Sequence, residues 1–287
     1  DVRDAADVFR PVYDASDAGD GYVSLEVNPH LARDTPGTVQ EARRLWAALD
    51  RPNVFIKVPA TAEGLPAIRQ LIGEGINVNV TLLFGLPRYR KVVEAYLDGI
   101  ETRTARGAPV GRVASVASFF VSRIDALVDL LLEQRIAQGG PGADAARSLL
   151  GQVAVASAKL AHQIHKELFA SDRFRELARQ GARPQRLLWA STSTKNPAYG
   201  DVKYVDSLIG PDTVNTMPME TLNAYRDHGQ PAVRLEDDID HARQVLQQLP
   251  QLGIALDQVT QQLEDEGVEK FNQPFDKLLK AIEDVQS

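Results

Sequence analysis

The stretch Val54–Thr61 reads VFIKVPAT, an apolar strand that contains a single lysine, Lys57. Its β-branched and aromatic residues are typical of a strand that is buried on both faces. Burial of an ammonium group is costly, so such a lysine needs a carboxylate partner or a chemical role. Desolvation favours the neutral amine, which can attack a carbonyl carbon to form a Schiff base. The alternative is that Lys57 ends the strand and faces solvent, and this stretch alone favours neither.

Five further strands are predicted, and the intervening segments have helical patterns. The strands are expected at Tyr22–Val27, Ile76–Phe84, Val113–Val121, Arg186–Ser191 and Thr213–Pro218. Helices are expected at Asp1–Tyr13, Thr38–Leu49, Gly64–Ile72, Tyr89–Arg103, Ile124–Ile136 and Ala143–Phe169, the last extended by a charged helix to Gln180. From Met219 to Ser287 the chain is expected to be helical, in pieces that Pro231, Gly253 and Gly267 separate. Alternating strands and helices indicate right-handed βαβ units and a parallel sheet. No linker interrupts the pattern, so we expect a single domain over residues 1–287.

Two α/β folds contain such a sheet, the open doubly wound sheet and the (β/α)₈ TIM barrel. The chain has no Gly-x-Gly-x-x-Gly or Gly-Lys-Ser/Thr loop, which excludes the usual nucleotide-binding open sheets. Polar residues lie toward the carboxyl end of each strand, where a barrel assembles its active site, although open sheets also bind ligands there. The pattern favours the barrel. Because a barrel needs eight strands and six are identifiable, we expect two strands upstream of Asp1.

Composition excludes several classes of function. The 287 residues carry a net charge of −7, which argues against a nucleic-acid-binding surface. The absence of cysteine excludes disulfides, a thiolate nucleophile and cysteine-based metal sites. No apolar run approaches the ~20 residues that span a membrane. We therefore expect a soluble cytoplasmic protein with no nucleic-acid or membrane partner.

Polar residues on the strands next to Lys57 form a candidate catalytic set. Glu26 lies in an apolar run, where its pKa could be raised toward general acid/base use, or it forms a structural ion pair with Lys57. Asn79 and Thr81 alternate on the next strand and therefore face the same side of the sheet. They suit substrate hydroxyls or a bound water, or are buried polar groups that the backbone satisfies.

Other polar residues suit an anion. Ser118 and Arg123 bracket a strand end and the start of the next helix, a combination that suits a phosphate group. The hydroxyl-rich loop Ser191–Asn196 contains Lys195 and follows a late strand, where barrels frequently bind phosphate, although a solvated turn is the commoner explanation of such a loop by itself. The five histidines form no convincing metal or triad set, and we expect no metal, even though His162 and His165 have i, i+3 spacing.

Five motifs together resemble the transaldolase family in order and spacing. They are VSLEV (23–27), FIKVPAT (55–61), NVNVTLLF (77–84), SFFVSRID (118–125) and WAST (189–192), within a resemblance that extends from Asp1 to about Phe275. The resemblance implies a (β/α)₈ barrel that transfers a dihydroxyacetone unit through a Schiff base in the pentose phosphate pathway. The implied donors are sedoheptulose 7-phosphate and fructose 6-phosphate, and the acceptors are glyceraldehyde 3-phosphate and erythrose 4-phosphate. No metal or organic cofactor is implied, because the lysine supplies the electron sink.

The resemblance also implies a role for each candidate residue. Lys57 matches the Schiff-base lysine, and Glu26 matches the glutamate that holds a proton-shuttling water together with Thr81. Asn79 and Ser118 match residues that bind the dihydroxyacetone hydroxyls.

The phosphate-binding residues match less completely. Arg123 matches the phosphate-binding arginine, and Ser191 matches a serine of the same subsite. Many relatives have a second arginine where this chain has Ser193, and Lys195 is the candidate replacement.

The chain departs from the family pattern at its start. The first-strand aspartate and the second-strand Thr-x-Asn-Pro motif of the family are not found before Tyr22. The six strands then correspond to the third to eighth of the family. The alternatives to a transaldolase are a fructose 6-phosphate aldolase-like enzyme and an inactive fragment. Either a monomer or a homodimer is expected.

Overall fold

The computed structural model describes residues 1–286 and is built around one parallel β-sheet. Six strands lie side by side in chain order, and every neighbouring pair is parallel. They are β1 (Val23–Glu26), β2 (Val54–Pro59), β3 (Val78–Leu83), β4 (Ser115–Phe120), β5 (Arg186–Ala190) and β6 (Thr213–Asn215). The sheet is open, with β1 and β6 at its edges. The predicted α/β class and the six predicted strands are confirmed.

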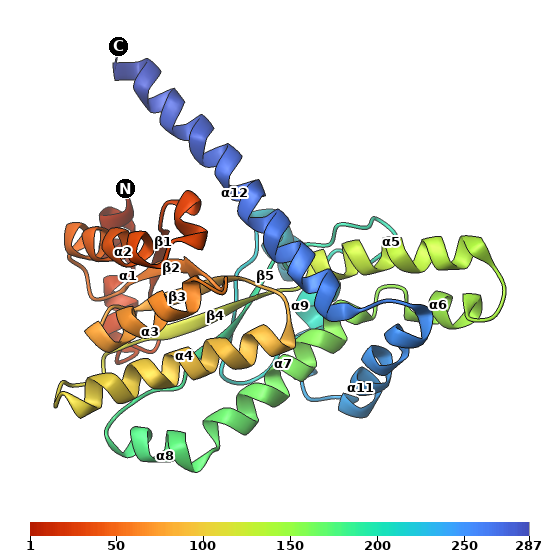
Figure 1. The fold of residues 1–287 in the computed structure, drawn as a ribbon, viewed down its shortest axis with the longest axis horizontal. Helices are drawn as coiled ribbons and strands as arrows, with labels where there is room; N and C mark the ends of the chain where they lie inside the picture. The colour runs from red at the N-terminus through yellow and green to blue at the C-terminus, as the bar shows by residue number, and fades with distance from the viewer. Residues whose placement is uncertain (287) are drawn as a thin grey trace.

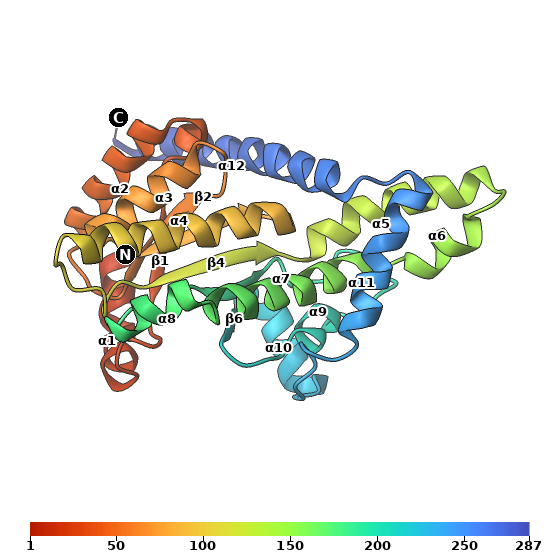
Figure 2. The ribbon, with the colours of Figure 1, turned by 60° about the horizontal axis from the view of Figure 1, so that its bottom comes forward.

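Helices join the strands and pack against the sheet. Helix α2 packs on α3, α3 on α4 and α4 on α7, as Figures 1 and 2 show. The helices are α1 (Val2–Ala15), α2 (Thr35–Leu49), α3 (Gly64–Glu74), α4 (Leu86–Ala105), α5 (Ser122–Gln138), α6 (Ala143–Leu149), α7 (Val153–Phe169), α8 (Asp172–Arg179), α9 (Lys203–Ser207), α10 (Met219–His228), α11 (Ile239–Gln248) and α12 (Leu256–Gln286), with 3₁₀ helices η1 (Pro29–Arg33) and η2 (Leu249–Leu252). No helix in residues 1–286 is long and apolar enough to cross a membrane.

Strand β2 illustrates how the sequence pattern separates the two faces of the sheet. Side chains alternate along a strand, so Val54, Ile56 and Val58 share one face and Phe55 and Lys57 the other. The three aliphatic side chains are fully buried, on the face where α2 and α3 contact β2. Lys57 therefore lies on the face opposite to α2 and α3.

The amino end of that second face is closed by aromatic rings. The Tyr22 ring stacks on Phe55 with a centroid distance of 4.3 Å. Tyr13 of α1 meets Tyr22 edge-on at 5.3 Å. Offset and edge-on pairs of this kind are the favoured aromatic geometries.

Two helix predictions are wrong. The long helix predicted over Ala143–Phe169 is two helices, α6 and α7, and its charged extension is a separate helix, α8. Gly151 adopts φ +70° between α6 and α7, where its N–H donates to the Asp129 carboxylate at 2.8 Å, and Ser171 caps α8.

Gly267, predicted to separate two helical pieces, lies inside α12. A Cβ at Gly267 would be 2.9 Å from Leu82 Cδ2, so glycine here permits a close approach of α12 to β3.

Candidate active site

The register of the sheet places three candidate residues in one row. Glu26 pairs with Lys57 across β1 and β2, and Lys57 pairs with Asn79 across β2 and β3. Parallel strands in register present paired side chains on the same face. Three polar groups from separate parts of the chain therefore lie side by side. Glu26 ends β1 and Lys57 lies in the second half of β2, but Asn79 is the second residue of β3, so the expectation that the polar residues lie toward the carboxyl ends of their strands is wrong for Asn79.

Lys57 and Glu26 form a partly buried ion pair. Lys57 Nζ donates to Glu26 Oε2 at 3.2 Å, and the two side chains are 23% and 21% exposed. Burial raises the pKa of Glu26 above its usual value, and the charge of Lys57 opposes that increase. Lys57 therefore does not end in free solvent. The other oxygen, Glu26 Oε1, is buried without a hydrogen-bond partner.

Asn79 of β3 forms hydrogen bonds with side chains of two other strands, β4 and β1. Ser118 of β4 donates to Asn79 Oδ1 at 2.7 Å, and Asn79 Nδ2 donates to Ser24 Oγ of β1 at 3.1 Å. Asn79 and Ser118 are 5% and 2% exposed. The two predicted residues thus lie together. Ser24 was not predicted, although it precedes Glu26 by two positions and the strand alternation could have indicated it.

Thr81 lies at an irregularity of β3. Its side chain is fully buried, and its Oγ1 has no hydrogen-bond partner. The register between β3 and β4 shifts between Val80 and Leu83, and Leu82 adopts φ +54°, which is unusual for a residue with a side chain. Such irregularities redirect side chains and occur frequently next to active sites.

Arg123 lies in the first turn of α5, beside the end of β4. Its guanidinium lies 5.2 Å from the centroid of the Phe120 ring. Among residues 1–286, no hydrogen bond or ion pair of Arg123 is formed, and the charge of Glu266 acts on it from α12. Burial lowers the pKa of Arg123 while leaving the group a cation, since arginine titrates far above neutral pH. Its donors are available to an anion.

Ser191 is joined directly to the start of α5. The Ser122 N–H donates to the Ser191 carbonyl at 2.9 Å, and the two hydroxyl oxygens are 3.0 Å apart. Ser191 adopts φ +55°, which turns the chain sharply after β5. The exposed Lys195 donates to Ser193 Oγ at 2.8 Å. Ser122 and Lys195 line one cavity of about 280 Å³, so the loop cation borders the start of α5.

A buried polar network joins α5 to α7 and α9. Asp125 of α5, 1% exposed, accepts from the Ala154 N–H at 2.7 Å, Tyr204 at 2.9 Å and Lys203 at 3.3 Å. These partners come from α7 and α9. One carboxylate therefore fixes three elements around the cavity.

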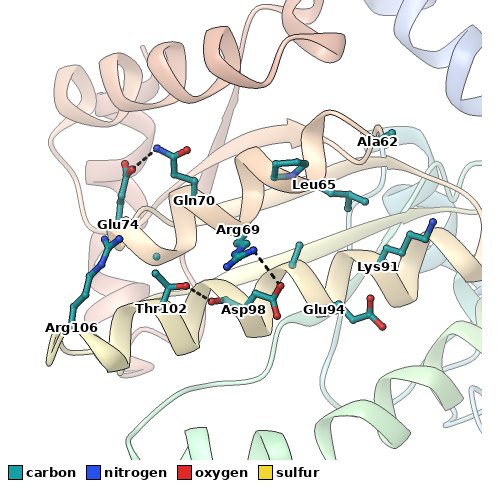
Figure 3. Close-up of a pocket in the computed structure, with 13 residues that line it drawn as sticks. Ala62, Leu65, Arg69, Gln70, Glu74, Lys91, Glu94, Asp98, Thr102 and Arg106 are labelled. Carbon is teal, nitrogen blue, oxygen red and sulfur yellow. Dashed lines mark hydrogen bonds and ion pairs between the residues drawn. The ribbon is translucent and has the colours of Figure 1, made fainter.

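A large hollow of the surface lies elsewhere. A cavity of about 720 Å³ opens between α3 and α4, on the outer side of the helices (Figure 3). Its walls carry both charges, with Arg69 3.9 Å from Asp98 across the two helices and Gln70 bonded to Glu74 along α3. None of the candidate residues lines it. Its size therefore does not make it the candidate active site.

Comparison with known proteins identifies the family. The model of the Transaldolase/Fructose-6-phosphate aldolase family matches residues 1–282. The chain belongs to this family. A transaldolase of Trichodesmium erythraeum is 48% identical over 288 residues, which cover 99% of this chain and 76% of the relative. A transaldolase of Saccharopolyspora erythraea is 50% identical, over 98% of this chain and 75% of the relative, and transaldolase 1 of Streptomyces avermitilis is 51% identical, over 98% and 73%.

Membership of the transaldolase/fructose-6-phosphate aldolase family agrees with the sheet. The six parallel strands in chain order are consistent with a barrel of this family, although the sheet is not closed. Within residues 1–286, no group of three or more histidine, aspartate or glutamate side chains is arranged to hold a metal ion.

Proposed function

We propose that this chain acts as a transaldolase of the pentose phosphate pathway. The observation that carries the proposal is the row of Glu26, Lys57 and Asn79 on three adjacent strands, in a chain about 50% identical to transaldolases. A dihydroxyacetone unit passes from a ketose phosphate to an aldose phosphate. The donors are sedoheptulose 7-phosphate and fructose 6-phosphate, and the acceptors are glyceraldehyde 3-phosphate and erythrose 4-phosphate.

Lys57 is the proposed nucleophile. Its amine attacks the ketose carbonyl carbon, and loss of water leaves a protonated imine. The hydroxyl on C4 of the sugar then gives its proton to the bound water described below, and the bond between C3 and C4 breaks. This step releases an aldose and leaves the electron pair on the retained three-carbon unit as an enamine. The enamine carbon then attacks the aldehyde of the acceptor, and hydrolysis of the new imine frees the amine. The contact of 3.2 Å with Glu26 supports a lysine that exchanges protons during this cycle.

Glu26 and Thr81 are the proposed holders of the water that carries protons. Each has a buried oxygen without a protein partner, Glu26 Oε1 and Thr81 Oγ1. Buried polar atoms normally find a partner, so these two are suited to a bound water. The raised pKa of Glu26 brings its carboxyl closer to the range in which general acid/base catalysis is efficient. Asn79 and Ser118 bind the hydroxyls of the three-carbon unit.

The phosphate of the sugar binds where α5 begins. Arg123 supplies a guanidinium without a carboxylate partner in the described part of the chain, and Ser191 supplies a hydroxyl 3.0 Å from that of Ser122, the residue that precedes Arg123. Planar guanidinium groups bind phosphate through paired hydrogen bonds. Lys195 adds a cation at the edge of a neighbouring cavity, which Ser122 lines but Arg123 and Ser191 do not.

Acceptor dependence tests the function. With fructose 6-phosphate as donor, product should form rapidly when erythrose 4-phosphate is added and hardly at all without it. A Lys57→Met variant should form no product under either condition. An aldolase would instead release free dihydroxyacetone at the same rate with or without acceptor. The relatives named transaldolase do not favour that alternative or an inactive fragment.

The expected partners follow from this reaction. Sugar phosphates are the ligands, and the net charge of −7 does not favour nucleic acid. We also propose a cytoplasmic location, because phosphorylated sugars are charged and are retained inside cells. A monomer or a homodimer fits the reaction equally well.

A further inference from the structure

Helix α12 crosses the carboxyl ends of the strands next to the row that contains Lys57. Gly267 of α12 approaches Leu82 at the end of β3 closely. One turn further along the helix, the centroid of the Phe271 ring lies 5.6 Å from Lys57 Nζ. Figure 1 shows α12 running past the strands and projecting beyond the rest of the molecule at its C-terminal end. A segment from the end of the chain thus covers the proposed nucleophile.

Polar contacts on both sides of Phe271 hold α12 in place. Before it, Glu264 is 6% exposed and accepts from Arg88 Nε of α4 at 3.1 Å. After it, Asp276 contacts His30 of η1 at 2.7 Å. Phe271 itself is half-buried and packs against the apolar core. The position of the ring is therefore set by contacts that lie outside the row of Glu26, Lys57 and Asn79.

The ring and the carboxylate of Glu26 act differently on the nitrogen of Lys57. The distance of 5.6 Å is within the range of a cation–π interaction, whereas Glu26 makes a direct contact at 3.2 Å. A charged imine at this nitrogen is a delocalised cation attached to a carbon chain, which an aromatic face can cover and stabilise. A carboxylate cannot exclude water from that carbon chain, but a ring can.

We propose that Phe271 controls the fate of the enamine on Lys57, favouring transfer to an acceptor over loss to water. This inference rests on the proposed transaldolase function. The enamine has two outcomes. In transfer, its nucleophilic carbon attacks the aldehyde carbon of the acceptor and a new carbon–carbon bond forms. In loss, that carbon takes a proton from water instead, a second water adds to the imine carbon, and the carbon–nitrogen bond breaks to release free dihydroxyacetone and the amine.

Phe271 acts on the charged nitrogen of Lys57 and on the access of water to the imine carbon. We expect no bond between its side chain and the sugar. Removal of the ring opens the imine to water and withdraws the cation–π contact, which is worth roughly 1 kcal/mol or a few-fold to tenfold in rate. A purely structural role for Phe271 would lower both outcomes equally through loss of folded protein. The ratio of released dihydroxyacetone to transferred unit distinguishes these cases, because the amount of folded enzyme cancels.

The experiment measures that ratio in the full chain with fructose 6-phosphate, with and without erythrose 4-phosphate. The variants are Phe271→Ala, Phe271→Leu and Phe271→Tyr. The matched control is Phe275→Ala, one turn further along α12, where the ring faces His30 at 6.3 Å. Urea unfolding of each variant establishes that it is folded, and borohydride trapping establishes that Lys57 still forms the adduct.

We expect Phe271→Ala to raise the ratio roughly tenfold, Phe271→Leu to raise it less, and Phe271→Tyr and Phe275→Ala to leave it near the starting value. If Phe271→Ala forms the adduct normally but its ratio of released to transferred dihydroxyacetone is within twofold of that of the starting protein, the proposed role of Phe271 is overturned and the transaldolase proposal is not. An equal rise in Phe275→Ala also overturns the role of Phe271, because the effect would then come from α12 as a whole. A starting protein that forms no adduct at Lys57 overturns the transaldolase proposal itself.

Discussion

Replacement of Lys203 by methionine should destabilise the protein in a pH-dependent way. Lys203 Nζ lies 3.3 Å from Asp125 Oδ2, and the two side chains are 21% and 2% exposed. Removing one member of a buried ion pair leaves a charge without its partner, at a cost of about 3–5 kcal/mol. Asp125 keeps the donors Tyr204 and Ala154, and Lys203 is not fully buried, so we expect about 2–3 kcal/mol at neutral pH.

The sign of the pH dependence follows from Asp125. Burial raises its pKa above the ordinary value of 3.8, against the charge of Lys203. Without Lys203 the pKa of Asp125 rises further, and the ionised carboxylate is the destabilising form. The loss of stability should therefore be complete above the raised pKa and shrink as the pH falls through it, because a protonated carboxyl needs no cation.

Urea unfolding at pH 7 and at pH 4.5 measures both effects. Lys277→Met is the matched control, because Lys277 is an exposed lysine of α12, and its stability should change by no more than about 0.5 kcal/mol. A loss below 1 kcal/mol in Lys203→Met at pH 7, or the same loss at both pH values, would refute the assignment of Lys203 as the charge partner of Asp125.

Three further predictions follow from the site and the core. Arg123→Ala should lower kcat/KM for fructose 6-phosphate by about 10–100-fold, which corresponds to the loss of a hydrogen bond to a charged group, and Arg123→Lys should recover part of that loss. An unchanged kcat/KM in steady-state assays of Arg123→Ala would mean that the phosphate binds elsewhere. Glu26→Gln should lower kcat by about 10²–10⁴-fold. Because burial raises the pKa of Glu26, kcat/KM of the wild-type protein should fall with decreasing pH at a value above pH 4.5. If the same fall persists in Glu26→Gln, another group is responsible for it. Burial lowers the pKa of His165 from 6.5 to about 4, so the unfolded chain binds its proton first and the unfolding free energy should fall by about 3 kcal/mol between pH 6.5 and pH 4. His165→Gln should flatten that dependence in urea titrations, and an unaltered slope would argue against a neutral buried ring.

Local pattern predicted the part of the site that depends on strand alternation. Glu26, Lys57 and Asn79 each lie in an apolar run that marks a buried strand, and parallel register then places them side by side. Ser118 donates to Asn79 although the register pairs Asn79 with Val116, two positions earlier on β4. These residues could be found because strand side chains have a fixed period and the strands follow chain order.

Features that depend on tertiary contacts could not be predicted. The bulge at Thr81 and the positive φ of Leu82 leave no mark in a run that reads as a regular strand. Gly267 was read as a helix break because glycine has a low helix propensity, whereas it permits a close approach to Leu82. The ring of Phe271 over Lys57 joins residues from distant parts of the chain, which no local periodicity encodes.

Reductive trapping tests the central proposal, a Schiff base at Lys57, most directly. The protein is incubated with fructose 6-phosphate and borohydride, digested, and mapped by mass spectrometry, with Lys57→Met as the control. We expect one three-carbon or hexose phosphate adduct on the peptide that contains Lys57 and none in the control. An adduct on a different lysine, or no adduct in a folded protein, would contradict the assignment of Lys57 as the nucleophile.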